Sequence, residues 1–459
     1  MKTIRRLLLP GLALALLAAG CRGVPTTGEK AARQDLAAVT ARLPAPAQRS
    51  HSLPTLTADA GLSNFLACAL LNSPAVESAF DDWAASVERI TLERSLPDPK
   101  LTFQAYIQDT LTSLMPGLMQ DLPGPGKRSA ATEVATAESR SQYFVFEGAV
   151  LQAAVDFKTA YYNLHFLDQR LRLNREMLAL QTDLEADTRA ENEAGKATLQ
   201  DVYRAQIERD QLTTTVTNLA DSRQSLFAQY KATLGFTPDQ PDPPVPATFE
   251  STPLALGADD LLAAAFARNP RLKAAEAEVR RAEAAVAQAR KTEEPDFSAG
   301  LQAETYSPPF YWPQVSMTLP VWRDKFAAQM AAAAAGQRGA QARLTAEQLK
   351  LMVDFAARTY DYREATRNLA LLEQELIPKA RQSLAIARAA YLSGRVDFAG
   401  LLDARRACLG FQLEAVQEQT RREITLAELS LSIAGVPPPG APLADTPPAV
   451  STTSPLRQP

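Results

Sequence analysis

The sequence has few of the residues that build disulfide scaffolds and zinc sites: only three of its 459 residues are cysteine and two are histidine. The three cysteines, Cys21, Cys68 and Cys408, are too few for a disulfide scaffold, and with only two histidines, His51 and His165, a zinc enzyme is not expected. No phosphate loop, His/Glu metal motif or Ser/His/Asp spacing stands out. We therefore expect no catalytic residues, no metal site and no cofactor, and we predict that the protein is not an enzyme.

A strong net charge and long apolar runs are also missing. The formal net charge is −4, and no basic stripe is present, which argues against binding to nucleic acid. Beyond the N-terminus, no apolar stretch reaches the roughly 20 residues that a transmembrane helix needs. If the mature protein spans a membrane, it must do so with β-strands, which indicates an outer membrane.

The N-terminus is typical of an exported protein. Lys2, Arg5 and Arg6 precede an apolar run over residues 7–17, so residues 1–20 are predicted to be a signal peptide. The following LAAGC at residues 17–21 resembles a lipoprotein cleavage box, in which Cys21 would become the lipidated N-terminus. Arg22 stands where an aspartate would retain a lipoprotein in the inner membrane, so we expect export to the outer membrane. The alternative is an ordinary secretory signal with an incidental cysteine.

Residues 61–237 and 256–436 are two copies of one structural repeat. Under a shift of 196, and later 199, residues of the first copy fall on identical residues of the second. The most informative matches are Pro74, Pro99, Tyr161, Arg189 and Gly195 with Pro270, Pro295, Tyr360, Arg388 and Gly394. The remaining segments are predicted to be an N-terminal extended segment at 21–60, a proline-rich connector at 238–255 and a disordered tail at 437–459.

Each copy contains a predicted pair of strands. Apolar and polar residues alternate over 101–107 and 297–304, with partner strands around 118–122 and 314–319. The turn of the second pair, residues 306–312, is rich in aromatics, as expected at the interface between a barrel and its membrane. These aromatics are Tyr306, Phe310, Tyr311 and Trp312. The alternative is two ordinary hairpins on a soluble domain.

Helices are predicted on both sides of each strand pair. Residues 62–95 and 260–292 each favour one helix, and residues 127–194 favour a helix of 68 residues, roughly 100 Å long. The stretch from 126 to 237 has no proline, and the stretch from 321 to 436 has only Pro378. Leucines at coiled-coil spacing run along these stretches. Gly195 and Gly394 are expected to turn each long helix back on itself, because glycine permits a tight reversal.

The small number of strands has a consequence for assembly. A closed membrane barrel needs at least about eight strands, because an open edge leaves backbone groups unsatisfied in lipid. One chain supplies four. The strands can therefore cross a membrane only if several copies of the chain share one sheet.

The ordered recurrence of these features resembles the TolC-like outer-membrane factor family over residues 55–435. The resemblance is carried by the strand-to-helix joints LPGPGK at 122–127 and LPVWR at 319–323, and by the segments GKATLQDVYRAQ and GRVDFAGLLDARRA that begin at Gly195 and Gly394. It implies a mainly α fold with a small membrane β-barrel. Long antiparallel helical hairpins would form an α-barrel, and four strands per chain would contribute to a trimeric 12-stranded β-barrel.

The resemblance also implies a function and partners. The chain would be the outer-membrane channel of a tripartite efflux system, a passive homotrimeric exit duct embedded in outer-membrane lipid and extending into the periplasm. Its partners would be a periplasmic membrane-fusion adaptor and an inner-membrane pump of the resistance-nodulation-division type. The Pro-Gly-Lys joint and residues 396–404 resemble the heavy-metal branch of the family, which makes metal cations the candidate cargo.

Residue roles are carried over from the same resemblance. Asp403 matches a position where acidic residues form the periplasmic gate; the other gate position, one helical turn earlier, is Gly400. The alternative is that Asp403 is a solvated residue or pairs with Arg405 or Arg406. The hairpin tips that would dock the adaptor comprise Gly195, Lys196, Asp201, Gly394, Arg395 and Asp397.

Two other functions remain open from the sequence. The chain could be the outlet of a type I secretion system, in which the cargo is a protein. It could also be a structural coiled-coil lipoprotein or an adaptor without a channel. An adaptor should carry one helical hairpin beside a lipoyl-like β-domain, whereas this chain has two hairpins and little other strand signal.

Overall fold

A computed structural model describes residues 24–43, 54–108, 110–246, 249, 258–304 and 310–433. The chain divides into two compact units, each described here by itself. The first comprises residues 1–52, 75–146 and 273–347, and the second residues 53–74, 147–272 and 348–459. Each unit therefore takes segments from both sequence repeats. None of the helices in the described part of the chain is both long and apolar enough to cross a bilayer.

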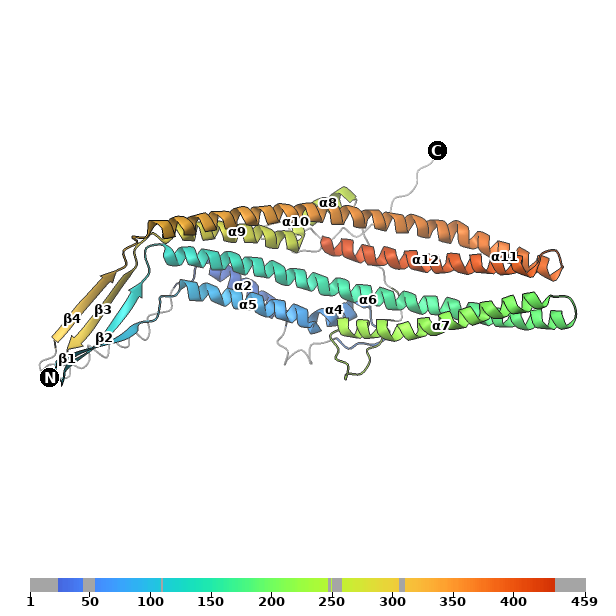
Figure 1. The fold of residues 1–459 in the computed structure, drawn as a ribbon, viewed down its shortest axis with the longest axis horizontal. Helices are drawn as coiled ribbons and strands as arrows, with labels where there is room; N and C mark the ends of the chain where they lie inside the picture. Colours follow the sequence, from blue (N-terminus) through green and yellow to red (C-terminus); the bar gives the residue numbers. More distant parts are fainter. Residues whose placement is uncertain are drawn as a thin grey trace, which may run out of the picture. The chain divides into compact units, whose positions relative to one another are not determined.

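The first unit is built around one antiparallel sheet of four strands, drawn as arrows in Figure 1. The strands are β1 (Lys100–Gln108), β2 (Thr110–Leu122), β3 (Phe297–Glu304) and β4 (Phe310–Met317), and they pair in chain order. β2 belongs to the first repeat and β3 to the second, so the sheet joins the two repeats. Helices α2 (Thr27–Thr40), α5 (Pro74–Arg94) and α9 (Pro270–Lys291) supply the rest of the unit, together with the beginnings of the two long helices α6 and α10.

The second unit consists of helices. Its elements are α4 (Leu62–Asn72), most of α6 (Lys127–Glu193), α7 (Leu199–Thr233), α8 (Ala258–Arg268), the end of α10 (Arg323–Leu371), the π-helical η1 (Leu372–Leu376), α11 (Ile377–Leu392) and α12 (Phe398–Ser432). The helix–helix order of the first repeat recurs in the second, and α7 and α12 each have 35 residues. The mainly α fold class with two helical hairpins and four strands is confirmed.

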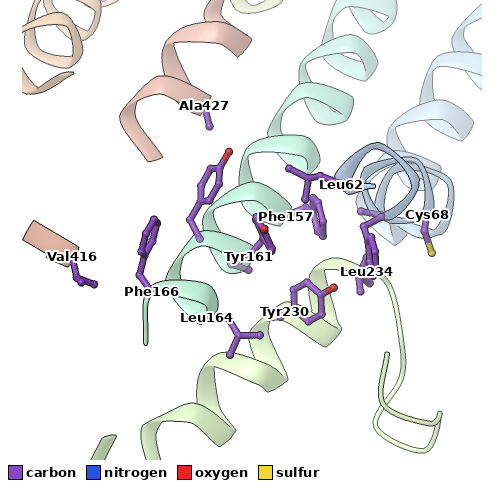
Figure 2. Packing of buried hydrophobic residues seen from close by; sticks show 14 residues of the cluster. Leu62, Cys68, Phe157, Tyr161, Leu164, Phe166, Tyr230, Leu234, Val416 and Ala427 are labelled. Atoms are coloured by element: carbon purple, nitrogen blue, oxygen red, sulfur yellow. The ribbon is translucent and has the colours of Figure 1, made fainter. Parts of the chain in front are cut away.

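The main core of the second unit gathers aromatic side chains where α4, α6, α7 and α12 meet (Figure 2). Phe157, Tyr161 and Tyr230 are fully buried in it. Burial of aromatic rings supplies much of the hydrophobic stabilisation of such a core. Cys68 lies in the same cluster, and burial raises the pKa of its thiol to about 11. Within the described residues Cys68 and Cys408 are free and buried.

The prediction of an extended segment over residues 21–60 is wrong, because residues 27–40 form helix α2. Its start is capped by Thr26, whose side chain accepts a hydrogen bond from the Glu29 N–H. Glu29 is buried and forms an ion pair with Arg94 of α5 at 2.7 Å. This tertiary pairing, which the local sequence pattern does not reveal, supports a short helix with a weak apolar face.

The predicted single helices at 62–95 and 260–292 are each two helices, and these two predictions are wrong in the same way. The breaks fall at Ser73 and Asn269, each of which directly precedes a proline. A residue before proline is disfavoured in the α conformation, whereas the proline itself fits the first turn of the next helix. Asn269 also caps α9, since its side-chain oxygen accepts a hydrogen bond from the Arg271 N–H at 3.0 Å.

Pro378 coincides with a π-helical turn in the long helical stretch of the second repeat. The five π-helical residues of η1 come directly before α11, whose second residue is Pro378. Proline removes one backbone donor and crowds the preceding turn of an α-helix. A locally wider turn accommodates that crowding without ending the helix.

Candidate functional site

The four-stranded sheet has two chemically different faces. Residues that pair directly across antiparallel strands point to the same face. One row across the sheet is Leu101, Leu118, Leu301 and Pro313, and the next row is Thr102, Gly117, Gln302 and Trp312. We call the first the apolar face and the second the polar face. Phe103, Leu301 and Val315 are exposed on the apolar face.

Hydrogen bonds join the strands across the polar face. The Gln302 amide donates to Gln104 Oε1 at 2.9 Å and receives a bond from the Gln314 amide at 2.5 Å. Nearer the helices, Lys100 binds Asp121 at 2.5 Å, and the Ser298 hydroxyl donates to Asp121 at 2.8 Å. The polar face is therefore a hydrogen-bonded layer suited to contact with water.

β2 is much longer than the sequence predicts. The strand expected around residues 118–122 extends over Thr110–Leu122. The sequence signal is weak because Pro116 and Gly117 interrupt it. The structure accommodates the proline by starting the β2–β3 ladder at Gly117 and pairing Pro116 only with Phe103 of β1. Pro116 thus lies where β3 requires no donor from it.

The predicted aromatic turn is partly wrong. Phe310, Tyr311 and Trp312 belong to β4, whereas Tyr306 lies outside the described residues. The register places Tyr311 on the apolar face, opposite Ala303, and places Phe310 and Trp312 on the polar face, opposite Glu304 and Gln302. Their role at a membrane interface stays a prediction. The register places Phe310 and Trp312 on the polar face with Glu304 and Gln302, and not on the apolar face that a lipid contact would need.

The joints between strands and helices are tied together by Asp296. Its Oδ1 accepts hydrogen bonds from the Gly124 N–H and from Lys127 Nζ, both at 2.8 Å. Burial by itself raises the pKa of the Asp296 carboxyl, but the Lys127 ammonium and the Gly124 N–H more than offset this effect, so the pKa is lowered. The end of β2 is thereby fixed to the start of β3.

We expect Asp296→Asn to lower the free energy of unfolding by about 1 kcal/mol at neutral pH, because two charge-assisted hydrogen bonds weaken at a partly exposed site. Because the pKa of the Asp296 carboxyl is lowered by folding, its ionised form stabilises the folded state at pH values above 3.8, the ordinary pKa of an aspartate. The difference between wild type and variant should therefore be constant above about pH 5 and vanish as the pH falls through the lowered pKa. Urea unfolding at several pH values measures it, with the exposed Asp98→Asn as control; an equal effect in the control would contradict the assignment.

The tips of the two helical hairpins are built alike. Gly195 and Gly394 have φ of 74° and 73°, a conformation that other residues rarely adopt. The backbone N–H of the residue after each glycine donates a hydrogen bond to a carbonyl of the preceding helix. Lys196 donates to Glu191 O and Arg395 donates to Ala390 O, both at 2.8 Å. Gly195, Lys196, Gly394 and Arg395 are exposed. The predicted glycine turns are confirmed, and the matching caps agree with a duplicated sequence.

Two of the predicted docking residues also cap helices. Asp201 forms a capping box with Thr198 at the start of α7, and Asp397 accepts a hydrogen bond from the Gly400 N–H at the start of α12. Capping residues fix where a helix begins. Docking of an adaptor at these tips stays a prediction, and substitutions at either aspartate would also change the helix start.

A small apolar core holds the two tips together. Phe398, Leu401 and Leu402 of α12 pack with Leu184 of α6 and Ala205 of α7. Phe398 is only 2% exposed. These contacts place the first turn of α12 against the first hairpin.

Three polar links add to this core. Tyr391 donates a hydrogen bond to Glu191 at 2.6 Å, and Arg405 donates one to the Leu180 carbonyl at 3.0 Å. Arg406 forms an ion pair with Glu208 of α7. Burial, and then the bond to Glu191, raises the pKa of Tyr391, so its hydroxyl stays protonated and remains a donor. Tyr391, Glu191 and Glu208 carry no local sequence signal for these links, because only the fold brings them together.

Asp403 is exposed on α12, one residue beyond the buried Leu402. Its candidate partners are engaged elsewhere, since Arg405 binds a carbonyl and Arg406 binds Glu208. The pKa of Arg406 is raised first by its hydrogen bond to Glu208, and the charge of Asp403 contributes. The role of Asp403 in a gate stays a prediction. Cys21 lies outside the described residues, and within them no group of three or more His, Cys, Asp or Glu side chains could hold a metal ion.

Residues 261–435 match the family model described as outer membrane efflux protein. No curated protein sequence matches the chain. Among solved structures, the chain is similar to a membrane protein from Pseudomonas aeruginosa, with a TM-score of 0.73 at 20% identity over 83% of this chain and 91% of that one.

Two further structures show the same likeness. The outer membrane protein VceC from Vibrio cholerae matches with a TM-score of 0.67 at 18% identity, covering 81% of this chain and 94% of its own. The MtrE outer membrane channel of Neisseria gonorrhoeae, in its open state, matches with a TM-score of 0.69 at 18% identity, covering 83% and 95%. At these identities the likeness shows the fold, and it extends over nearly the whole length of those chains.

Proposed function

We propose, for a chain whose residues 261–435 match the model of the outer membrane efflux protein family, that it belongs to this family and acts as a passive homotrimeric exit duct in a tripartite efflux system. Its place is the outer membrane. The single observation that supports the trimer most directly is the sheet: four strands with one apolar face and one polar face, in which β1 pairs only with β2 and β4 only with β3 among the described residues.

The outer edges of β1 and β4 would need further strands to pair with in a membrane. In lipid, each unpaired backbone N–H or C=O costs several kcal/mol, so β1 and β4 must pair with strands of neighbouring copies. Three chains of four strands give a 12-stranded barrel, within the range of bacterial outer-membrane barrels. The apolar face would then contact lipid and the polar face would line the water-filled interior, which we call the lumen.

The partners are proposed from the family resemblance. A periplasmic membrane-fusion adaptor would dock at the exposed hairpin tips, Gly195 to Lys196 and Gly394 to Arg395, and would connect the duct to an inner-membrane pump of the resistance-nodulation-division type. Lipidation of Cys21 would add an anchor in the outer membrane. Asp403 would face the lumen near the tips, where three copies of its carboxylate attract cations and repel one another.

The cargo proposed from the heavy-metal likeness is a metal cation, delivered by the pump and conducted without a binding site in the duct. Deletion of the gene should then lower cellular tolerance to zinc, cobalt or copper. Loss of tolerance to antibiotics alone would assign the duct to a drug pump, and loss of protein export alone would assign it to type I secretion.

The assembly can be tested with two neighbouring residues on opposite faces of β4. Val315 is exposed on the apolar face, and Ser316 lies on the polar face, opposite Ser298. Val315→Lys should reduce heat-modifiable, detergent-resistant trimers, because a lysine on the lipid-facing side of a barrel is destabilising, by up to about 2–4 kcal/mol at the bilayer midplane and by less towards its edges. Ser316→Lys should still assemble and should shift the channel towards anions. Gel electrophoresis and planar-bilayer conductance measure both.

The opposite pattern would reverse the assignment of the two faces. A wild-type protein that is monomeric and electrically silent after purification with its lipid would refute the duct and support a structural coiled-coil lipoprotein or adaptor.

A further inference from the structure

The geometry points to a binding site for organic ammonium ions on the polar face of the sheet, formed by Phe310, Trp312 and Glu304. This inference rests on the proposed function, because it takes the polar face to line a water-filled lumen. It adds a ligand class and a location: the end of the lumen remote from the helices.

The strand register brings the three residues together. Glu304 pairs directly with Phe310, and Gln302 pairs directly with Trp312. Side chains two residues apart on a strand share a face, so all four lie on the polar face. The hydrogen bonds that join Gln302 to Gln104 and Gln314 fix this face independently of the register.

The position of the three side chains along the strands follows from where β3 joins the helices. β3 begins at Phe297, next to Asp296, which is bound to the start of the long helix α6 through Lys127. Glu304 is the last residue of β3, and Phe310 is the first residue of β4. The three side chains therefore lie at the end of the β3–β4 pair farthest from the joints, in the half of the sheet that would face the outer mouth of the duct; β1 and β2 extend beyond them.

The side chains form a preassembled cluster. The rings of Phe310 and Trp312 meet edge to face, with centroids 4.8 Å apart. The indole N–H of Trp312 donates to Glu304 Oε2 at 3.2 Å. Both rings remain exposed, Phe310 by 56% and Trp312 by 49%. The rings are thus oriented by contacts within the cluster and still have surface available to a ligand.

The charge of the polar face favours cations at this end. Among the described residues of the four strands, its charged side chains are Lys100, Asp121 and Glu304. Lys100 and Asp121 neutralise each other near the helices, in an ion pair of 2.5 Å. Among the described residues, Glu304 forms no ion pair with a cationic side chain, and its carboxylate lies beside the Trp312 ring.

Aromatic faces together with one carboxylate recognise organic cations. The ring quadrupole attracts a cation within about 6 Å of the ring centroid, and this attraction is greatest for tryptophan. Quaternary ammonium ions are weakly hydrated and can lie against the rings, whereas a hydrated metal ion needs several oxygen, nitrogen or sulfur ligands. One carboxylate and two hydrocarbon-rich rings do not provide such a set.

In the trimer the cluster would occur three times around the outer mouth. A large organic cation bound there would narrow the exit, so its binding can be measured as block of the channel current. The full chain, reconstituted as trimers in planar bilayers in potassium chloride, is titrated with tetrabutylammonium from the outer side. We expect block that saturates with concentration.

The variants separate this site from general attraction of cations. Trp312→Leu should raise the half-blocking concentration about fivefold or more, Trp312→Phe should raise it less because a smaller ring remains, and Glu304→Gln should raise it about threefold. Tyr311→Leu, on the same strand but on the apolar face, should leave it within about twofold. Cobalt chloride serves as the inorganic cation and should block more weakly than tetrabutylammonium.

Three results would overturn the inference while leaving the duct intact: unchanged block in Trp312→Leu, an equal loss in Tyr311→Leu, or stronger block by cobalt than by tetrabutylammonium in the wild type. Absence of any wild-type conductance would instead refute the proposed function, and the inference with it.

Discussion

Reversing the charge of Arg406 should raise the open population of the proposed duct. In Arg406→Glu, the ion pair with Glu208 becomes a repulsion between two carboxylates, and the second hairpin loses one of three polar links to the first. At a partly exposed site the change is on the order of 1–1.5 kcal/mol, which corresponds to roughly a fivefold to tenfold change in a two-state equilibrium. We expect a rise of this size in the population of a high-conductance state, measured in single-channel recordings.

The charge swap provides the matched control. Arg406→Glu combined with Glu208→Arg restores opposite charges at the same two positions and should return the conductance towards the wild-type value, as a double-mutant cycle requires. If the double variant conducts like Arg406→Glu alone, the pair does not couple the hairpins. If neither variant changes conductance, the link between the tips has no part in gating.

Truncation of Phe398 should destabilise the tips more than any polar change. The ring is 2% exposed, packs with Leu401 and Leu184, and meets Tyr391 edge to face with centroids 6.1 Å apart. Phe→Ala changes at buried positions cost about 3–5 kcal/mol, because hydrophobic burial is lost and a cavity remains. We expect Phe398→Ala to raise amide exchange in the tips by about two orders of magnitude or more.

The residues at which exchange becomes faster show whether the core around Phe398 stabilises the tips alone or the whole chain. Hydrogen exchange followed by mass spectrometry should show faster exchange at residues 384–405 and 184–205, with the strands unchanged. Arg395→Ala, at an exposed position on the same tip, should change exchange little. Faster exchange throughout the sheet in Phe398→Ala would show that the tip core also determines the stability of the first unit.

Much of this fold could be predicted from the sequence because its signals are local and repeated. Long stretches without proline predict α6 and its counterpart, and the helix bounds Lys127–Glu193 differ from the prediction by one residue. Period-two alternation predicts β3 correctly over 297–304. The glycines at 195 and 394 predict the turns, because a left-handed conformation at a helix end favours glycine.

The differences between sequence and structure occur at prolines and where the deciding contact is distant. Helical composition around Pro74 and Pro270 predicts one long helix, but a helix ends before each of these prolines. Pro116 weakens the strand signal, but the strand includes it because it pairs on one side only. Helix α2 depends on Glu29 and Arg94, which are 65 residues apart.

In the candidate site, too, features with a local sequence signal could be predicted and features set by distant contacts could not. The sequence identified the tips and Asp403, because turns and family motifs are local. It could not identify the links of Tyr391 to Glu191 and of Arg406 to Glu208, since each joins residues about 200 positions apart. It also assigned Phe310 and Trp312 to a turn, because the face of a strand depends on its register, which a string of adjacent aromatics does not reveal.

The pairing of β2 with β3 bears on how such a molecule could have arisen. Inside the chain, the last strand of one repeat meets the first strand of the next, and the contact proposed between neighbouring chains, β4 with β1, has the same form. An ancestral polypeptide of half this length would have offered the same two edges and would have needed six subunits to complete the ring. Fusion of two such genes halves the number of molecules that must find one another, and it frees the two halves to diverge at the outer mouth and at the tips.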